Sequence, residues 1–165
     1  MLHNYLLPEC NFEREMLTIL GYSIKTDIYK ANGCNGVITR IKNEYKGKLA
    51  IGWIDEDPTQ HVNRHPDYFN YTEVGLAKYK VHFKRKGESN NYLIEIEGEF
   101  EPWFEPIGSS KQIRKADFKI KNPLHEYSKN EVPPNVKEYL RRVVEANPAP
   151  FDYIRYLIER VKNNQ

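Results

Sequence analysis

The spacing of apolar positions changes several times along the first sixty residues. Residues 11–22 and 37–45 place apolar side chains at intervals of three and four, which is typical of helices with one buried face. Residues 3–8 and 49–54 are short apolar runs, and residues 23–30 alternate between polar and apolar side chains, as strands do. The pattern predicts three strands alternating with two helices.

Beyond residue 56 the pattern becomes less regular. The segment 57–77 contains two prolines and little periodicity, which predicts a long loop or an irregular helix. Residues 78–86 and 91–100 alternate strongly around a Gly87 turn, which predicts a β-hairpin. Residues 102–123 are interrupted by proline, glycine and serine and predict irregular structure, whereas 132–146 and 149–164 carry the apolar stripes of two helices.

Strands that alternate with helices favour parallel β-α-β-α-β connectivity over residues 3–55. The run LAIGWI at 49–54 is almost continuously apolar, which is typical of a strand covered on both faces. We therefore predict an α/β fold with a largely parallel central sheet, followed by a β-hairpin and two C-terminal helices.

Composition narrows the class of protein without naming a partner. The chain has 165 residues, 39% hydrophobic, 13% aromatic and 29% charged, and its net charge is only +2. A net charge this close to zero does not by itself indicate a nucleic-acid or membrane partner. The two cysteines lack zinc spacing, and neither a membrane span nor a signal peptide is expected, so the sequence favours a cytoplasmic protein.

The candidate functional residues are acidic side chains. Asp55, Glu56 and Asp57 follow the apolar run directly, and in a continuing strand Asp55 and Asp57 would share one face about 6.6 Å apart. Glu9 follows the first strand, and the carboxyl ends of parallel strands form the usual ligand crevice of open α/β sheets. Carboxylates suit Mg²⁺, which typically takes one or two from the protein. We expect Glu9, Asp55 and Asp57 to converge, with solvated loop acids as the plainer alternative.

This order of elements resembles the Toprim domain of topoisomerases, primases and the overcoming-lysogenization-defect nucleases. The residues that carry the resemblance are LLPECNFERE (6–15), NGCNGVITRI (32–41) and LAIGWIDEDP (49–58). The resemblance implies a three-layer, Rossmann-like sandwich in a single domain, with a core over 1–104 and an irregular and helical extension over 105–165. Cys10 stands where the family commonly has glycine.

The resemblance also implies roles for individual residues. Glu9, Asp55 and Asp57 would bind Mg²⁺ or Mn²⁺ and act in catalysis on nucleic acid phosphodiesters, and Glu101 would be an accessory metal ligand. A nuclease, acting alone or within a defence or repair assembly, is the first hypothesis. A non-catalytic binding or regulatory module and an unrelated α/β structural protein are the alternatives. A partner protein or a second copy of the chain is a further expectation.

Phosphoryl transfer also needs cationic groups near the acids. Two basic runs offer them, one in the hairpin and one in the irregular segment, although each alone is also what a solvated surface presents. The candidates for binding a phosphate backbone are Lys84, Arg85, Lys86, Lys111, Arg114 and Lys115.

Overall fold

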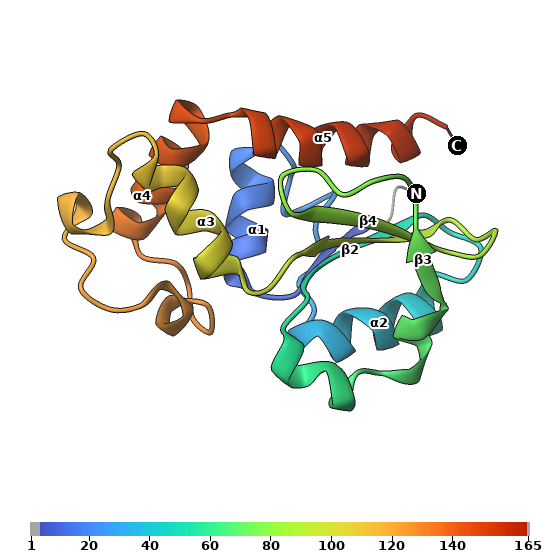
Figure 1. Cartoon of the computed structure of the whole chain (residues 1–165). Coiled ribbons are helices and arrows are strands. Elements are labelled where there is room, and N and C mark those ends of the chain that lie inside the picture. Colours follow the sequence, from blue (N-terminus) through green and yellow to red (C-terminus); the bar gives the residue numbers. More distant parts are fainter. Residues whose placement is uncertain (1–3, 165) are drawn as a thin grey trace.

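The computed structural model describes residues 4–164, which form an α/β fold around one open, mixed sheet (Figure 1). The strand order is β1-β2-β5-β4-β3, with β1, β2 and β5 parallel and β4 and β3 antiparallel to their neighbours. The strands are β1 (Leu6–Pro8), β2 (Ala50–Asp55), β3 (Tyr71–Glu73), β4 (Val81–Lys86) and β5 (Asn91–Ile96). The parallel half therefore brings the carboxyl ends of β1 and β2 to one edge.

Helices surround this sheet and also extend beyond it. The α-helices are α1 (Asn11–Ile19), α2 (Gly33–Glu44), α3 (Phe100–Ser109), α4 (Pro134–Ala146) and α5 (Ala149–Lys162). Four short 3-10 helices are η1 (Pro58–Asn63), η2 (Pro66–Asn70), η3 (Lys115–Phe118) and η4 (Leu124–Tyr127). Within residues 4–164 no helix is both long and apolar enough to cross a membrane.

Two hydrophobic clusters lie against the central strands. Val37 and Ile41 of α2 belong to one cluster, together with Ile54 of β2. Trp53 of β2 belongs to the other, with Phe12 of α1 and apolar side chains of α3, α4 and α5. Successive side chains of a strand point to opposite faces, so β2 is buried on both, as its continuous apolar run predicts.

Gly52 shows how closely α2 packs on β2. A Cβ atom at this position would lie 2.6 Å from Cγ1 of Val37 and 2.7 Å from Cδ2 of Leu93. A larger residue would therefore push α2 away from the strand whose end carries Asp55.

The expected strand at 23–30 is wrong. This segment forms turns, and only Ile28 makes an isolated parallel bridge, to Leu6. The Asp27 carboxylate accepts the Ser23 N–H at 2.8 Å and the Asp27 N–H donates to the Ser23 carbonyl at 2.8 Å, so residues 23–27 close a local turn. Backbone hydrogen bonds to β1 begin at Asp27, whose carbonyl accepts the Leu6 N–H at 2.9 Å. Residues 4–55 thus contribute two strands, β1 and β2.

Two other expectations shift. The second helix, expected at 37–45, begins earlier, since α2 spans Gly33–Glu44. Residues 100–109 are helical although Pro102 and Pro106 predict irregular structure; Pro102 lies in the first turn, where its missing N–H costs little. The hairpin is confirmed as β4 and β5, and the two C-terminal helices as α4 and α5.

Candidate functional site

Glu9 and Asp55 meet at the carboxyl end of the parallel strands. Glu9 follows β1 directly and its backbone N–H donates to the Trp53 carbonyl at 2.9 Å, which continues the ladder between β1 and β2. Oε2 of Glu9 accepts the backbone N–H of Asp55 at 3.0 Å. Residues 46 positions apart are in direct contact because their strands are parallel neighbours.

The Asp55 carboxylate lies between β2 and the start of α3. Its Oδ2 accepts the backbone N–H of Phe100, the first residue of α3, at 2.9 Å. Its Oδ1 is buried and has no hydrogen-bond partner among the described residues. An unpartnered buried carboxylate oxygen is costly, and this cost disfavours the ionised form of Asp55.

A third acid, Glu13, lies beneath the same site. Its side chain is only 1% exposed, and its Oε2 accepts the Cys10 N–H at 2.9 Å. Sγ of Cys10 in turn accepts the Phe12 N–H at 3.3 Å, which completes a capping box at the start of α1. Cys10 therefore acts as the N-cap of α1.

Crowding and burial shift the protonation of these acids. Burial raises the pKa of Asp55 to about 9, and the negative charges of Glu13 and Glu9 add to the shift. Burial together with Glu13 raises the pKa of Glu9 to about 7, and burial also raises the pKa of Glu13. In the part of the chain that the structure describes, no Lys or Arg nitrogen lies within 4.0 Å of a carboxylate oxygen of these three acids. The arrangement concentrates negative charge without a matching cation.

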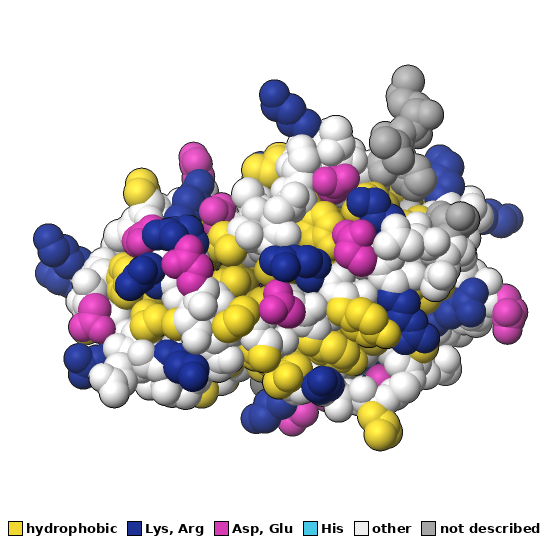
Figure 2. Space-filling model, turned by 90° about the horizontal axis from the view of Figure 1, so that it is seen from above, with side chains coloured by type: hydrophobic (Ala, Val, Ile, Leu, Met, Phe, Trp, Pro, Cys, Tyr) yellow, Lys and Arg dark blue, Asp and Glu magenta, His cyan; other side chains and the backbone are white. Residues whose placement is uncertain are grey.

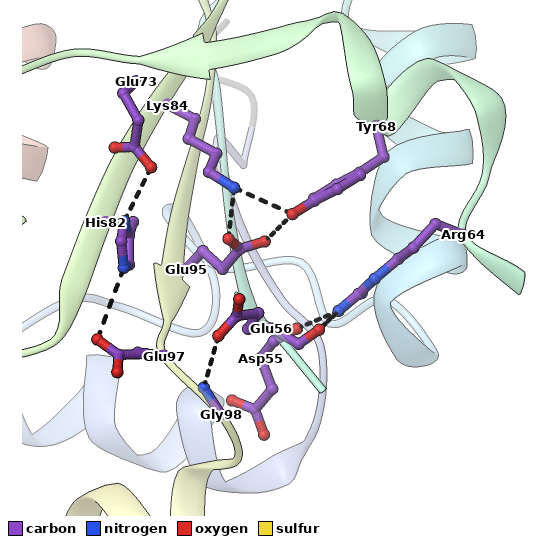
Figure 3. Close-up of polar contacts among 10 residues, drawn as sticks. All are labelled: Asp55, Glu56, Arg64, Tyr68, Glu73, His82, Lys84, Glu95, Glu97 and Gly98. Carbon is purple, nitrogen blue, oxygen red and sulfur yellow. Dashed lines mark hydrogen bonds and ion pairs between the residues drawn. The ribbon is translucent and has the colours of Figure 1, made fainter. Parts of the chain in front are cut away.

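Asp57 and Glu56 do not follow the strand alternation expected from the sequence. β2 ends at Asp55, and Asp57 adopts a left-handed conformation with φ of 31°. Its Oδ1 accepts the backbone N–H of Thr59 at 3.1 Å and the Thr59 hydroxyl at 2.6 Å, so Asp57 caps η1. The Glu56 carboxylate accepts the Gly98 N–H at 3.0 Å and holds the turn that follows β5 (Figure 3).

A cavity of about 470 Å³ opens beside these groups, and we call it the acidic cavity. Its lining includes Lys129, His125, Cys10 and Ser128. The acids that line it are Glu9, Glu13, Asp55, Asp57, Glu99 and Glu101. Asp57 thus reaches the same cavity as Asp55 although the two do not share a strand face.

Glu101 lines this cavity but is held by other groups. Its carboxylate accepts Nζ of Lys115 at 2.9 Å and the backbone N–H of Leu124 at 2.8 Å. Burial opposes ionisation, but these donors outweigh it and lower the pKa of Glu101 to about 2. Glu101 therefore ties α3 to η3 and η4, and its charge is already compensated.

The basic residues of the hairpin are paired within the fold. Lys84 donates to Oε1 of Glu95 at 2.5 Å and to the Tyr68 hydroxyl at 3.0 Å (Figure 3). Lys86 pairs with Asp67 at 2.6 Å, and Arg85 donates to the backbone carbonyls of residues 88 and 89. These side chains hold β4, β5 and η2 together.

The second basic run is partly paired. Lys115 lies between Glu101 and Glu105, Arg114 pairs with Asp117 at 3.6 Å, and Lys111 is exposed. Seen from above, Lys and Arg side chains are interspersed with Asp and Glu rather than gathered (Figure 2). The proposed phosphate track stays a prediction, with Lys111 and Arg114 as its most exposed members.

The residues of the acidic cavity fit a hard cation in their chemistry. Within residues 4–164, no three His, Cys, Asp or Glu side chains are arranged to hold one ion together. However, Mg²⁺ commonly takes only one or two protein carboxylates and fills its other positions with water. The unpartnered Oδ1 of Asp55, beside the Glu9 carboxylate, supplies that smaller set.

Sequence patterns alone did not nominate three residues that shape this site. Glu13 is indistinguishable from a favourable first-turn acid of a helix, although its spacing from Cys10 matches a capping box. Glu99 precedes α3, a helix that the sequence pattern did not predict because it contains two prolines. Arg64 follows η1, and its Nη2 donates to the carbonyls of Asp55 and Glu56 (Figure 3).

Comparison of the chain with protein-family models, with curated proteins and with solved structures found no match.

Proposed function

We propose that the protein binds Mg²⁺ or Mn²⁺ in the acidic cavity and acts on nucleic acid phosphodiesters as a Toprim-like, nuclease-like protein. The observation that carries the proposal is the buried, unpartnered Oδ1 of Asp55, placed beside Glu9 at the carboxyl end of the parallel strands. The proposal includes the three-layer Toprim-like arrangement of the fold, to which the two clusters against the central strands lend support.

In this proposal Asp55 and Glu9 hold the cation, and Asp57 lines the cavity beside them. A bound divalent cation supplies a Lewis acid for a phosphoryl oxygen and lowers the pKa of a bound water. The residues of this chain supply the position: the Phe100 and Asp55 N–H groups orient the carboxylates of Asp55 and Glu9, respectively. A cation would offset the burial, and the repulsion between the acids, that raise the pKa of Asp55 and Glu9.

Glu101 is a weaker candidate for a metal ligand than the sequence indicates. Lys115 and two backbone N–H groups already occupy its carboxylate. We therefore assign Glu101 to the support of the cavity wall.

Calorimetric titration with MgCl₂ and MnCl₂ tests the metal site. We expect one site with a Kd at or below the millimolar range in the wild type and at least a tenfold weaker Kd in Asp55→Asn. Asp152→Asn, which removes an exposed aspartate of α5, is the matched control and should bind like the wild type. No binding by the wild type at 10 mM metal would contradict the proposal, where 10 mM is about ten times that upper limit.

Nuclease assays separate catalysis from binding. Single- and double-stranded DNA and RNA should be cleaved in Mg²⁺ or Mn²⁺ and spared in EDTA, and Asp55→Asn should lose cleavage. Metal binding without cleavage of any of these substrates would favour the non-catalytic module. This alternative has one observation in its favour, since Glu9, Asp55 and Asp57 each already accept a backbone N–H.

A further inference from the structure

A further cavity, of about 360 Å³, lies among the turn before β4, one side of α3 and the junction of α4 and α5. We call it the Tyr79 cavity. Its lining is mostly apolar or aromatic, with Trp103 and three prolines, and its polar groups include Lys80 and the side chain of Asn147. An apolar cavity with a few polar groups is the usual form of a ligand site. The cavity shares no residue with the acidic cavity, but Glu101 of the acidic cavity lies only two positions before Trp103 on α3.

The turn that forms one wall of this cavity has an unusual backbone. Tyr79 and Lys80 have φ values of 56° and 58°, a region that residues other than Gly, Asn and Asp rarely adopt. Lys78 and Val81 close the turn through two backbone hydrogen bonds, and Nε1 of Trp103 donates to the Tyr79 carbonyl at 2.8 Å. Strained backbone of this kind concentrates at functional sites. The turn thus holds the Tyr79 ring at the mouth of the cavity at a cost in backbone strain.

Three tyrosine rings continue the surface from this turn onto α5. Tyr79 is 41% exposed and Tyr156 is 56% exposed. Tyr153 lies between them, stacked on Tyr156 with ring centres 6.3 Å apart and edge-on to Tyr79 at 6.0 Å. On the face that carries α5, hydrophobic side chains, a class that includes tyrosine, lie exposed between charged ones (Figure 2). Exposed aromatic rings are the platforms on which unpaired nucleobases stack.

The unpaired charges around these rings are positive. Lys78 and Lys80 flank Tyr79, and Arg160 lies one helical turn after Tyr156. Within residues 4–164, no carboxylate oxygen lies within 4.0 Å of a side-chain nitrogen of these three cations. The carboxylates of this region contact other groups of the fold: Glu73 and Glu97 contact His82, Asp152 contacts Arg155, and Glu159 accepts the Tyr22 hydroxyl. The surface is therefore complementary to a chain of phosphates.

We propose that the Tyr79 cavity and the three tyrosines bind single-stranded nucleic acid. One base enters the cavity, its neighbours stack on the exposed rings, and the three cations face the phosphates. A single strand fits better than a duplex, because its bases are free to leave the stack. It fits better than an acidic peptide, because carboxylates would use the cations and leave the flat rings unused. The role of the strand as a substrate, held beside the acidic cavity, rests on the proposed function; binding of the strand does not.

Titration of the full-length protein in EDTA tests this binding without metal. By fluorescence anisotropy we expect a labelled single-stranded oligonucleotide to bind with a Kd at or below about 10 µM, within the usual range of sequence-independent binding. The same sequence as a duplex, and poly-glutamate, should bind at least tenfold more weakly. Equal affinity for the duplex or for poly-glutamate, or no binding of the single strand, would overturn the proposal.

NMR locates the bound strand. The chain has two tryptophans, of which Trp103 lines the cavity and Trp53 is 1% exposed in the core. We expect the indole N–H signal of Trp103 to shift on saturation with the oligonucleotide and that of Trp53 to stay in place. A Trp103 signal that does not move would show that the strand binds elsewhere.

Two variants separate stacking from charge. Tyr79→Asn removes the ring and suits the left-handed backbone, so the turn should still fold, and we expect at least tenfold weaker binding. Tyr29→Asn, at another exposed tyrosine, is the matched control and should bind like the wild type. The double variant Lys78→Gln/Lys80→Gln should lower the slope of log K against log salt by about 1.4, two contacts at about 0.7 each. Equal affinities of the two tyrosine variants, or an unchanged slope, would contradict the proposal.

The result is independent of the metal site. Single-strand binding that persists in EDTA and in Asp55→Asn, and that Tyr79→Asn weakens, supports the Tyr79 cavity even where the metal proposal fails. Metal binding by a protein that does not bind the single strand would overturn the Tyr79 cavity and leave the metal proposal in place.

Discussion

Glu95 and Asp55 lie at the carboxyl ends of neighbouring strands, Asp55 as the last residue of β2 and Glu95 as the last but one of β5, and both are largely buried. Their surroundings are opposite; Figure 3 shows the groups that contact Glu95. Glu95 is 2% exposed, accepts the Tyr68 hydroxyl at 2.6 Å and pairs with Lys84. Asp55 lies among Glu9 and Glu13 and has no cation beside it. The Glu95 region satisfies its buried charge internally, whereas the Asp55 region does so only by protonation or by a ligand. This difference is why we propose the acidic cavity as the functional site.

The largest effect is expected where the buried charges are paired. Glu95→Ala leaves Lys84 buried without its partner and removes a bond to Tyr68, so we expect a loss of about 3 to 5 kcal/mol in the free energy of unfolding. Glu97→Ala, which alters an exposed strand-end glutamate, should change it by about 0.5 kcal/mol or less. Urea unfolding measures the free energy of unfolding of both variants. Equal losses in Glu95→Ala and Glu97→Ala would contradict a stabilising role for the buried pair of Glu95 and Lys84.

The second effect has the opposite sign. Asp55→Asn removes an ionisable group whose folded-state pKa is raised from 3.8 to about 9, so the wild type loses stability as pH rises through this interval. At pH 8 in EDTA the variant should therefore be more stable by at least about 1.4 kcal/mol, the equivalent of one pKa unit. Thermal unfolding at pH 5 and pH 8 checks this. If the stability of the variant changed with pH as much as that of the wild type, the pKa of Asp55 would not be raised in the folded state.

A smaller effect with the reverse pH dependence is expected at Glu101. Its pKa is lowered from 4.5 to about 2, so its charge stabilises the fold above pH 4.5 and this stabilisation disappears as pH falls toward 2. Glu101→Gln should cost about 1 kcal/mol at pH 7 and little near pH 2.5. The difference between variant and wild type across an acid unfolding series measures it; a constant difference would contradict the role of the charge.

The smallest effect on stability is expected at Asp57. Asparagine tolerates the left-handed backbone and keeps an oxygen for Thr59, so Asp57→Asn should change the free energy of unfolding by less than about 0.5 kcal/mol. The same variant should weaken Mg²⁺ binding measurably if Asp57 faces the cation. A destabilisation as large as that expected for Glu95→Ala would show that Asp57 serves mainly to stabilise the fold.

The sequence was most informative where pattern and topology agree. The apolar run before Asp55 predicted a strand covered on both faces, and parallel pairing with β1 is what brings Glu9 to Asp55. It failed where local bonds compete with the pattern: Asp27 closes a turn in an alternating segment, and Pro102 conceals the start of α3. Because no periodicity marks a residue buried by tertiary contacts, Glu13 and Arg64 emerge only from the structure. The roles of the acids in metal binding and catalysis stay predictions.

Crystals soaked in MnCl₂ test the central claim most directly, because the anomalous signal of manganese locates the ion. The account predicts one manganese peak in the acidic cavity, about 2.0 to 2.6 Å from carboxylate oxygens of Asp55 and Glu9, and no peak there in Asp55→Asn crystals. Wild-type crystals without manganese between Asp55 and Glu9 at saturating MnCl₂ would contradict it.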